Sequence, residues 1–313
     1  MSLVWAALLQ LMTAPLPDTV SAQAKAGLAA DAARPAAGPA MAERRARADA
    51  IQQEIGARQR ARYGVTMREG VIAGVPVREF VPRRSPRDDA VLLNLHGGGF
   101  VVDSGSITEN VPVAALTGQR VVAVRYRLSP EHRFPTAVDD ALNVYRALLR
   151  ERPNRRILLY GTSAGAILSA ELVARLRVEH LPLPAALGFF SGSADLATPG
   201  DSAALFLRDG AAAATALAGL YAPGRAPADP AVSPARGSLA GWPPTLCLSS
   251  SRDVLLSATA SFCRAVDDAG GDARLVVYDG LPHAFWSYIE APESDAAFAT
   301  MTRFLTRHLE PRR

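Results

Sequence analysis

Short apolar runs alternate with amphipathic stretches along most of the chain. Residues 65–72 and 75–82 alternate apolar and polar side chains on either side of Ala73 and Gly74, which predicts a β-hairpin. Six continuous apolar runs follow, at residues 90–95, 120–126, 156–161, 186–190, 244–250 and 274–280. Helical periodicity lies between and after these runs, at residues 135–151, 163–180, 257–270 and 294–309. Continuous apolar strands separated by helices are typical of a largely parallel sheet buried on both faces, so the pattern predicts an α/β fold that opens with antiparallel strands.

Two segments depart from this alternation. Residues 1–64 are rich in alanine, arginine and proline, with helical patterning at 42–55 and no strand signal. More than fifty residues separate Phe190 from Pro244, which is much longer than the usual connection between a strand and a helix. We expect an insertion there, at about 195–225, above the C-terminal edge of the sheet where a lid would lie.

The composition excludes several classes of function. The 313 residues, 49% hydrophobic and 20% charged, allow one large domain or two modest ones with a substantial core. Lys25 is the only lysine, which excludes a phosphate-binding Walker loop and a serine–lysine nucleophile pair. The net charge of +4 comes from mostly scattered arginines, so we expect no nucleic-acid partner and interpret the denser arginine patches as solvated helix faces. Cys247 and Cys263 are too few for a thiolate zinc site, and we expect two free buried thiols and no bound metal.

The N-terminus begins with a short apolar run, "LVWAALLQLM", that leaves the compartment open. No basic residue precedes the run, and it is too short for a stable membrane span. We therefore favour a cytoplasmic protein in which this run is a helix packed on the body. The alternative is export, with residues 1–22 as a signal peptide.

The stretch "LLYGTSAGA" contains the pattern G-x-S-x-G around Ser163. The pattern alone is weak evidence because glycine and serine are common residues. Ser163, however, directly follows a predicted strand and opens a predicted helix, which is the setting this motif needs to present a nucleophilic hydroxyl. Gly161 and Gly165 would keep side chains out of the strained turn. The alternative is a serine that caps a helix in a tight turn.

A serine nucleophile needs a base, and a histidine is the usual one. The chain has five histidines; His180 and His308 lie toward the ends of predicted surface helices, and His132 lies in a turn. His283 lies in a loop after the last predicted strand, so it shares the C-terminal edge of the sheet with Ser163. We predict that His283 is the base, with a helix-capping histidine as the alternative.

A carboxylate should hold the tautomer of the base. Asp253 follows the predicted strand "PTLCLSS", and the order Ser163, Asp253, His283 matches the chain order of this architecture. Asp195 and Asp139 compete, but Asp195 borders the expected lid and Asp139 lies in a helical pattern.

Three consecutive glycines follow the predicted strand "AVLLNL". Acyl transfer produces an oxyanion that needs backbone N–H donors, and glycine lets the main chain approach closely. We predict Gly98, Gly99 and Ala164 as these donors. A phosphate-binding loop is the alternative, but it would open a helix. His96 is expected to support the loop by hydrogen bonding.

Five segments together resemble the bacterial hormone-sensitive-lipase-like esterases of the α/β-hydrolase superfamily: "HGGGF", "YRLSPEHRFPTAVDDA", "GTSAG", "SRDVLLSATASF" and "GLPHAFW". The resemblance implies an α/β-hydrolase fold with a central, mostly parallel eight-stranded sheet in a catalytic domain at 65–313. It also implies a helical cap built from residues 1–64 and the insertion. The implied activity is that of a serine carboxylesterase for short-chain acyl esters, without a cofactor, in which Glu131 helps to hold the catalytic loops.

Two positions depart from the common pattern of this family. Thr162 replaces an aspartate before the nucleophile, which places the chain in the GTSAG branch, and Arg125 replaces an aspartate before "YRL". Neither change removes a catalytic group. Phe100, Phe190 and Trp286 are candidate walls of the substrate pocket, and core packing is the alternative for each.

Several functions would use the same residues. A lactonase, an amidase or a deacetylase needs the same nucleophile and base, and a ligand-binding protein of this fold is a less favoured alternative because both groups are present. We expect a small-molecule ester as the partner. The subunit count is open, with a homodimer as one alternative.

Overall fold

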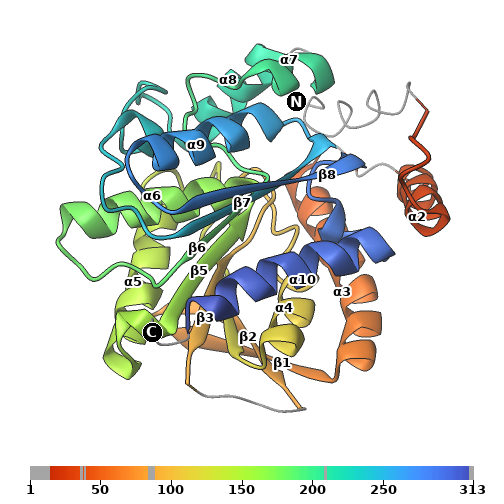
Figure 1. Cartoon of the computed structure of the whole chain (residues 1–313), viewed down its shortest axis with the longest axis horizontal. Coiled ribbons are helices and arrows are strands. Elements are labelled where there is room, and N and C mark those ends of the chain that lie inside the picture. Colours follow the sequence, from red (N-terminus) through yellow and green to blue (C-terminus); the bar gives the residue numbers. More distant parts are fainter. Residues whose placement is uncertain (1–14, 36–37, 39, 84–88, 208–209, 310–313) are drawn as a thin grey trace.

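A single eight-stranded sheet forms the centre of the molecule (Figure 1). The computed structural model describes residues 15–35, 38, 40–83, 89–207 and 210–309. The strands are β1 (Val65–Ile72), β2 (Val75–Pro82), β3 (Val91–Leu95), β4 (Arg120–Val124), β5 (Ile157–Thr162), β6 (Leu187–Phe190), β7 (Thr245–Arg252) and β8 (Ala273–Pro282). Their order is β1-β2-β4-β3-β5-β6-β7-β8; β2 is antiparallel to β1 and β4, and the other neighbours are parallel. The predicted α/β fold, its opening hairpin and its mostly parallel sheet are confirmed.

The middle strands are covered on both faces. Every residue of β3, β5 and β6 is buried, as their unbroken apolar sequences require. Parallel pairing places Leu95 beside Gly161 and Thr162 beside Phe190 at the C-terminal ends of these strands. The segments that leave these strands therefore meet at one edge of the sheet.

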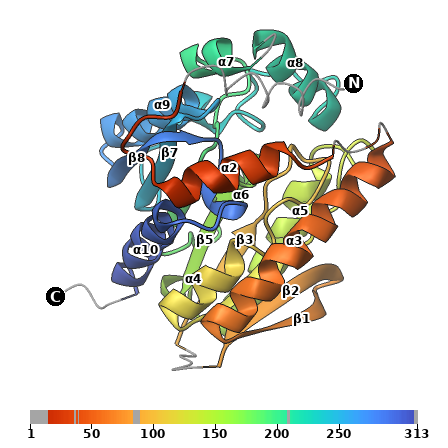
Figure 2. The ribbon, with the colours of Figure 1, turned by 90° about the vertical axis from the view of Figure 1, so that its right-hand side faces the viewer.

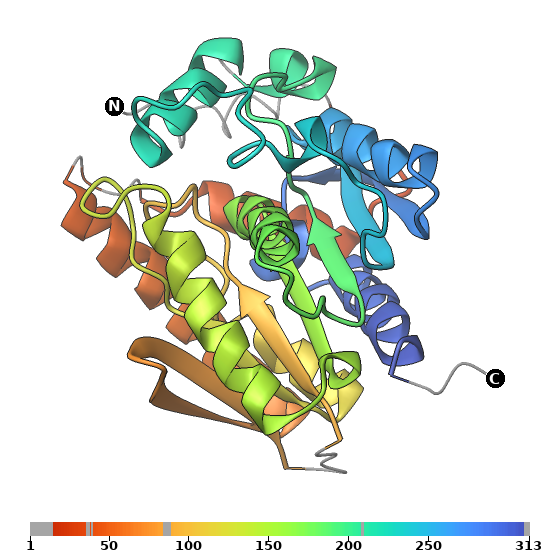
Figure 3. The same cartoon turned by 90° about the vertical axis from the view of Figure 1, so that its left-hand side faces the viewer.

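Helices pack on both faces of the sheet (Figures 1 and 3). They are α2 (Ala22–Ala32), α3 (Met41–Tyr63), α4 (Asn110–Thr117), α5 (Thr136–Glu151), α6 (Ala164–Val178), α7 (Asp201–Phe206), α8 (Gly210–Tyr221), α9 (Leu256–Asp268) and α10 (Pro292–Arg307). One apolar cluster joins the sheet to α5, α6 and α9, and the other joins its opposite face to α2, α4 and α10. Each cluster is continuous across several strands, so the sheet has two cores.

The N-terminal helices pack on this body (Figure 2). Val20, Ala24 and Leu28 are buried in the same cluster as α4 and α10. The prediction that the arginine-rich patch of α3 is a solvated face is wrong for one side of the helix, because Gln52 and Ile55 are only 2% exposed. This side of α3 carries polar residues because they form hydrogen bonds with the rest of the protein, as Arg45 and Gln52 do.

Helices α7 and α8 lie within the insertion expected at about 195–225. Figure 3 shows them beyond the C-terminal ends of β3 and β6, which the arrowheads mark. The apolar run near the N-terminus lies outside the described residues. In the part of the chain that the structure describes, no helix has both the length and the apolar character to cross a membrane.

Candidate active site

Ser163 lies in a sharp turn between β5 and α6. Its φ of 59° falls in the left-handed region, which non-glycine residues rarely occupy. A Cβ on Gly161 would lie 2.3 Å from the carbonyl oxygen of Gly165, and a Cβ on Gly165 would lie 1.9 Å from that of Leu95. Only glycine therefore lets α6 approach β3 and β5 this closely. The amide of Ser163 donates to the carbonyl oxygen of Phe190 across 2.9 Å, which fixes the turn to β6.

The loops after β7 and β8 bring Asp253 and His283 to this turn. Nε2 of His283 lies 2.9 Å from Oγ of Ser163, and Nδ1 lies 2.7 Å from Oδ1 of Asp253. Nδ1 donates to the carboxylate, which leaves Nε2 as the acceptor for the serine proton. The structure thus joins the three residues selected from the sequence in one hydrogen-bonded chain.

Asp253 is fully buried and still favours its charged form. Burial alone would raise the pKa of this carboxyl, but the charge and hydrogen bond of His283 and the hydroxyl of Ser249 outweigh burial, and the pKa lies below its ordinary value. Oδ2 accepts from Oγ of Ser249 across 2.6 Å, and Oδ1 accepts from the amide of Leu255 across 2.9 Å. A carboxylate fixed by three donors can orient the imidazole of His283.

The glycine loop lies directly against the serine. A Cβ on Gly97 would lie 3.2 Å from Cβ of Ser163. Gly98 and Gly99 have φ values of 118° and 61°, so a side chain at either position would strain the backbone. In the described chain, no protein group accepts from the amide of either residue. The amide of Ala164, the first residue of α6, has no acceptor within the helix.

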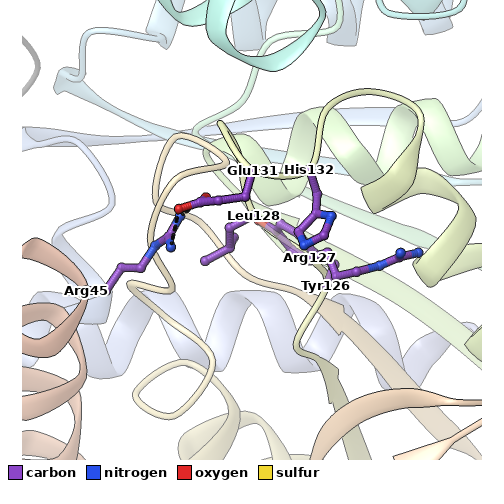
Figure 4. A pocket seen from close by; sticks show the side chains of 6 residues that line it. All are labelled: Arg45, Tyr126, Arg127, Leu128, Glu131 and His132. Atoms are coloured by element: carbon purple, nitrogen blue, oxygen red, sulfur yellow. Dashed lines mark hydrogen bonds and ion pairs between the residues drawn. The ribbon is translucent and has the colours of Figure 1, made fainter. Parts of the chain in front are cut away.

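His96 and Glu131 lie behind this loop. Nδ1 of His96 lies 2.8 Å from the carbonyl oxygen of Gly97, and its ring stacks on Tyr126 at 4.1 Å between centroids. Burial lowers the pKa of His96, so the ring is neutral. Glu131 pairs with Arg45 at 2.7 Å, on the rim of a shallow hollow (Figure 4). That hollow is lined by Arg45, Tyr126, Arg127, Leu128, Glu131 and His132.

The three candidate wall residues lie in the interior. Phe190 and Trp286 are 1% exposed and pack edge to face at 6.4 Å between centroids, on the core side shared with α4 and α10. Phe190 and Trp286 are therefore core residues, which is the alternative stated for them above. Phe100 is also 1% exposed; it stacks on Tyr221 of α8 at 3.6 Å between centroids. Phe100 thus joins the glycine loop to the insertion.

The competing carboxylates and histidines have other partners or positions. Asp139 pairs with Arg175, and Asp195 pairs with Arg236. His180 lies two residues past the end of α6, and His308 directly follows the end of α10. None of these residues contacts Ser163 among the hydrogen bonds of the described chain.

Glu109 is a residue near the site that the sequence did not single out. It is 3% exposed, and burial raises its pKa to about 8; the neighbouring polar side chains of Thr162, Asn94 and Trp286 oppose this only in part. Thr162 directly precedes the nucleophile. Glu109 lies in the turn just before α4 and carries no local sequence signal, since only the tertiary packing brings it to Thr162.

Among the described residues, no three histidine, cysteine, aspartate or glutamate side chains gather in a way that could hold a metal ion. Cys247 and Cys263 are free and buried, as expected.

Comparisons with known proteins agree with this geometry. The family model described as alpha/beta hydrolase fold matches residues 92–287. An acetyl-hydrolase of Streptomyces hygroscopicus is 35% identical over 77% of this chain and 83% of its own. An ethyl acetate hydrolase of Pseudomonas putida is 32% identical over 75% of this chain and 79% of its own. A crystal structure of an esterase from the bacterial hormone-sensitive lipase family is 28% identical and superposes with a TM-score of 0.82, over 93% of this chain and 99% of that chain.

The fold and the site thus define a hydrolase that presents a serine on a strand-to-helix turn. The chain belongs to the alpha/beta hydrolase fold family, and its neighbours in structure are bacterial esterases of the hormone-sensitive lipase group. The resemblance inferred from the five sequence segments is confirmed.

Proposed function

We propose that this protein is a serine carboxylesterase that hydrolyses short-chain acyl esters through an acyl-enzyme. The observation that carries the proposal is the chain of hydrogen bonds from Ser163 through His283 to Asp253, at 2.9 and 2.7 Å. A hydroxyl within hydrogen-bond reach of an oriented imidazole is the arrangement that nucleophilic acyl transfer needs.

Acylation begins when Oγ of Ser163 attacks the ester carbonyl and Nε2 of His283 takes its proton. The amides of Gly98, Gly99 and Ala164 donate to the oxyanion that forms, and the buried carboxylate of Asp253 stabilises the imidazolium. The C–O bond to the alcohol breaks as His283 returns the proton to the leaving oxygen. Water deprotonated by His283 then attacks the acyl carbon of the acyl-enzyme. The bond from that carbon to Oγ of Ser163 breaks, and His283 returns the proton to Oγ as the acid leaves.

The preference for short acyl groups is supported by the relatives named for acetyl and ethyl acetate hydrolysis. The segment 1–64 and the insertion at about 195–225 act as the cap in this proposal, since α3 and α8 both approach the glycine loop. Leu217 of α8 lies 3.5 Å from the position of a Cβ on Gly99. An ester held at that glycine would therefore contact the cap.

The test combines a fluorophosphonate label with p-nitrophenyl esters from two to twelve carbons. Labelling should fall on Ser163, and Ser163→Ala should lose at least about 10⁴-fold in kcat. Ser238→Ala removes an exposed serine and is the matched control. Label on another serine, or full activity of Ser163→Ala, would refute the assignment. Adding a γ-lactone and an acetanilide to the panel separates an esterase from a lactonase or a deacetylase.

We propose a cytoplasmic location, which the two free buried cysteines support. Fractionation with N-terminal sequencing of the native protein tests this, because cleavage near residue 22 would establish export instead. The homodimer stays a prediction, which sedimentation velocity can test.

A further inference from the structure

One side of α3 bonds directly to the segment that carries the glycine loop. Arg45, Asp49, Gln52 and Gly56 follow the spacing i, i+4, i+7, i+11 and so lie on one helix face. Every one of these residues meets the segment 97–107 or a residue bonded to it. This face differs from a solvated one, because its polar atoms have fixed partners in the body.

Arg45 makes the contact nearest to the glycines. Its Nε donates to the carbonyl oxygen of Val101 across 2.8 Å, and its Nη2 donates to that of Ser129 across 2.9 Å. The amides of Val101 and Val102 both donate to the carbonyl oxygen of Gly98. Two successive hydrogen bonds therefore connect the guanidinium to the Gly98–Gly99 peptide. The first joins Arg45 to the carbonyl oxygen of Val101, and the second joins the amide of Val102 to the carbonyl oxygen of Gly98.

The same guanidinium reaches the neighbouring loop. Nη1 and Nη2 donate to the two carboxylate oxygens of Glu131 at 3.0 and 2.7 Å. The amide of Ser129 donates to the carbonyl oxygen of Phe100 across 2.8 Å. Arg45 thus spans both loops, and Figure 4 shows it facing Glu131 across the rim of the hollow.

Gln52 holds the far end of the same segment. Its amide nitrogen donates to the carbonyl oxygen of Asp103 across 2.8 Å, and its amide oxygen accepts from the amide of Ile107 across 3.0 Å. Asp49 accepts from Arg78, which in turn donates to the carboxylate of Asp103. Helix α3 is therefore bonded at several points to the segment that directly follows the glycines, at Val101, Asp103 and Ile107.

We propose that Arg45 is a positioning residue for the hydrolysis, which holds the oxyanion-binding amides of Gly98 and Gly99 in place from α3. The inference rests on the proposed function, since it needs those amides to bind an oxyanion. Arg45 touches no reacting atom. It acts through the carbonyl oxygens of Val101 and Ser129, so its loss changes where the amides point.

Arg45→Met tests this proposal in the full-length protein. Because a small displacement of catalytic groups costs up to a hundredfold in rate, kcat for p-nitrophenyl acetate should fall about 10- to 100-fold, with KM changed less than about threefold. The inhibition constant of an aryl trifluoromethyl ketone, whose adduct with Ser163 carries an oxyanion, should rise by a similar factor. Arg45→Lys keeps the charge but not the planar fork, so it should recover only part of kcat.

Two controls separate positioning from stability. Arg58→Met removes an arginine of the same helix that pairs with Glu54 and Glu290, and its kcat should stay within about twofold of wild type. Glu131→Gln leaves the carbonyl contacts of Arg45 in place, so it should lose less kcat than Arg45→Met. Equal effects of Arg45→Met and Arg58→Met, or of Arg45→Met and Glu131→Gln, would overturn the proposal. If Ser163→Ala is inactive in the same assays, such a result leaves the esterase assignment intact.

Discussion

At the scale of single residues, the site depends on backbone conformations that few side chains tolerate. Ser163 has a φ of 59°, a conformation that costs a non-glycine residue about 1–3 kcal/mol and persists only where its surroundings fix it. The carbonyl oxygens of Leu95 and Gly165 leave no room for a Cβ at either neighbouring glycine. The close packing of β3 against α6 thus holds Ser163 in the conformation that exposes its hydroxyl.

The glycines of the loop differ in what a side chain would meet. A Cβ on Gly98 would lie 2.0 Å from the carbonyl oxygen of Val102, so a substitution there would damage folding together with turnover. On Gly99 the nearest atom is Cδ1 of Leu217, at 3.5 Å. A substitution at Gly99 should therefore disturb packing less than one at Gly98, so it gives the clearer test of oxyanion binding.

The raised pKa of Glu109 predicts a dependence of stability on pH. Burial raises this pKa to about 8, so the folded state holds the proton more tightly than the unfolded state does. The stability that this tighter proton binding adds to the folded state is fully present below the ordinary glutamate pKa, and it is lost as pH rises toward 8. Glu109→Gln cannot ionise, so its free energy of unfolding relative to wild type should rise by roughly 1 kcal/mol per pH unit between pH 6 and 8.

Urea unfolding at pH 6, 7 and 8 measures this difference. Glu151→Gln is the matched control, because the Glu151 side chain is 41% exposed. A constant difference between Glu109→Gln and wild type across these pH values would contradict the prediction.

The candidate site was predictable from sequence where each residue directly follows a strand. Ser163 follows β5 at once, and Asp253 and His283 follow β7 and β8, so the apolar runs locate all three at one edge of the sheet. Glu109 and Arg45 could not be found this way. Their side chains matter through contacts with segments distant in the sequence, and no spacing distinguishes them from solvated residues.

At the scale of elements, the insertion is held to the body by the last residue of α8. Tyr221 is 1% exposed; its hydroxyl donates to the carboxyl of Glu171 in α6 across 2.5 Å, and its ring stacks on Phe100. Burial raises the pKa of Glu171 well above its ordinary value, and the Tyr221 hydroxyl opposes this only in part. The carbonyl oxygen of Tyr221 also accepts from the amide of Phe134 across 2.8 Å. One residue thus ties the insertion to the nucleophile helix and the glycine loop.

Tyr221→Phe is expected to loosen this attachment without removing the ring. The buried carboxyl of Glu171 would lose its donor, which costs about 1–3 kcal/mol of unfolding free energy. Limited proteolysis should then cut faster within residues 195–225. Tyr278→Phe is the control, since it removes from β8 a hydroxyl that is bonded to Thr300 of α10. Identical cleavage rates for the two variants would show that the hydroxyl does not hold the insertion.

The elements themselves were largely readable from the pattern of apolar positions. The hairpin and the six further strands all appear, and so do helices in the five ranges with predicted helical patterning, 42–55, 135–151, 163–180, 257–270 and 294–309. Helix α4 was not predicted. Its residues Asn110 to Ala114 are all buried, so it has no polar face to reveal a helical period. The order of the strands in the sheet also lay beyond the pattern, since it depends on how the connections cross.

At the scale of the whole molecule, the N-terminal helices share the core of the sheet. Leu28 of α2 is 5% exposed and belongs to the apolar cluster that contains Phe298 and Leu305 of α10. Ser21 donates from its backbone and its hydroxyl to Glu293, at 2.6 and 2.8 Å. A segment without a separate core should not unfold separately from the body.

Equilibrium unfolding in urea should therefore show one transition, with the same midpoint by far-ultraviolet circular dichroism, tryptophan fluorescence and residual esterase activity. Leu28→Ala should lower all three midpoints together, since emptying a buried leucine site costs about 2–5 kcal/mol. Leu205→Ala, at a leucine that is 68% exposed, should leave them within error of wild type. If residues 15–63 were an independent cap, Leu28→Ala would lower the activity midpoint and split the circular dichroism transition, because α2 and α3 belong to this segment. The fluorescence of Trp242 and Trp286 in the body would then report an unchanged transition. A common shift of all three probes instead means that the cap segment stabilises the catalytic body and cannot be removed from it.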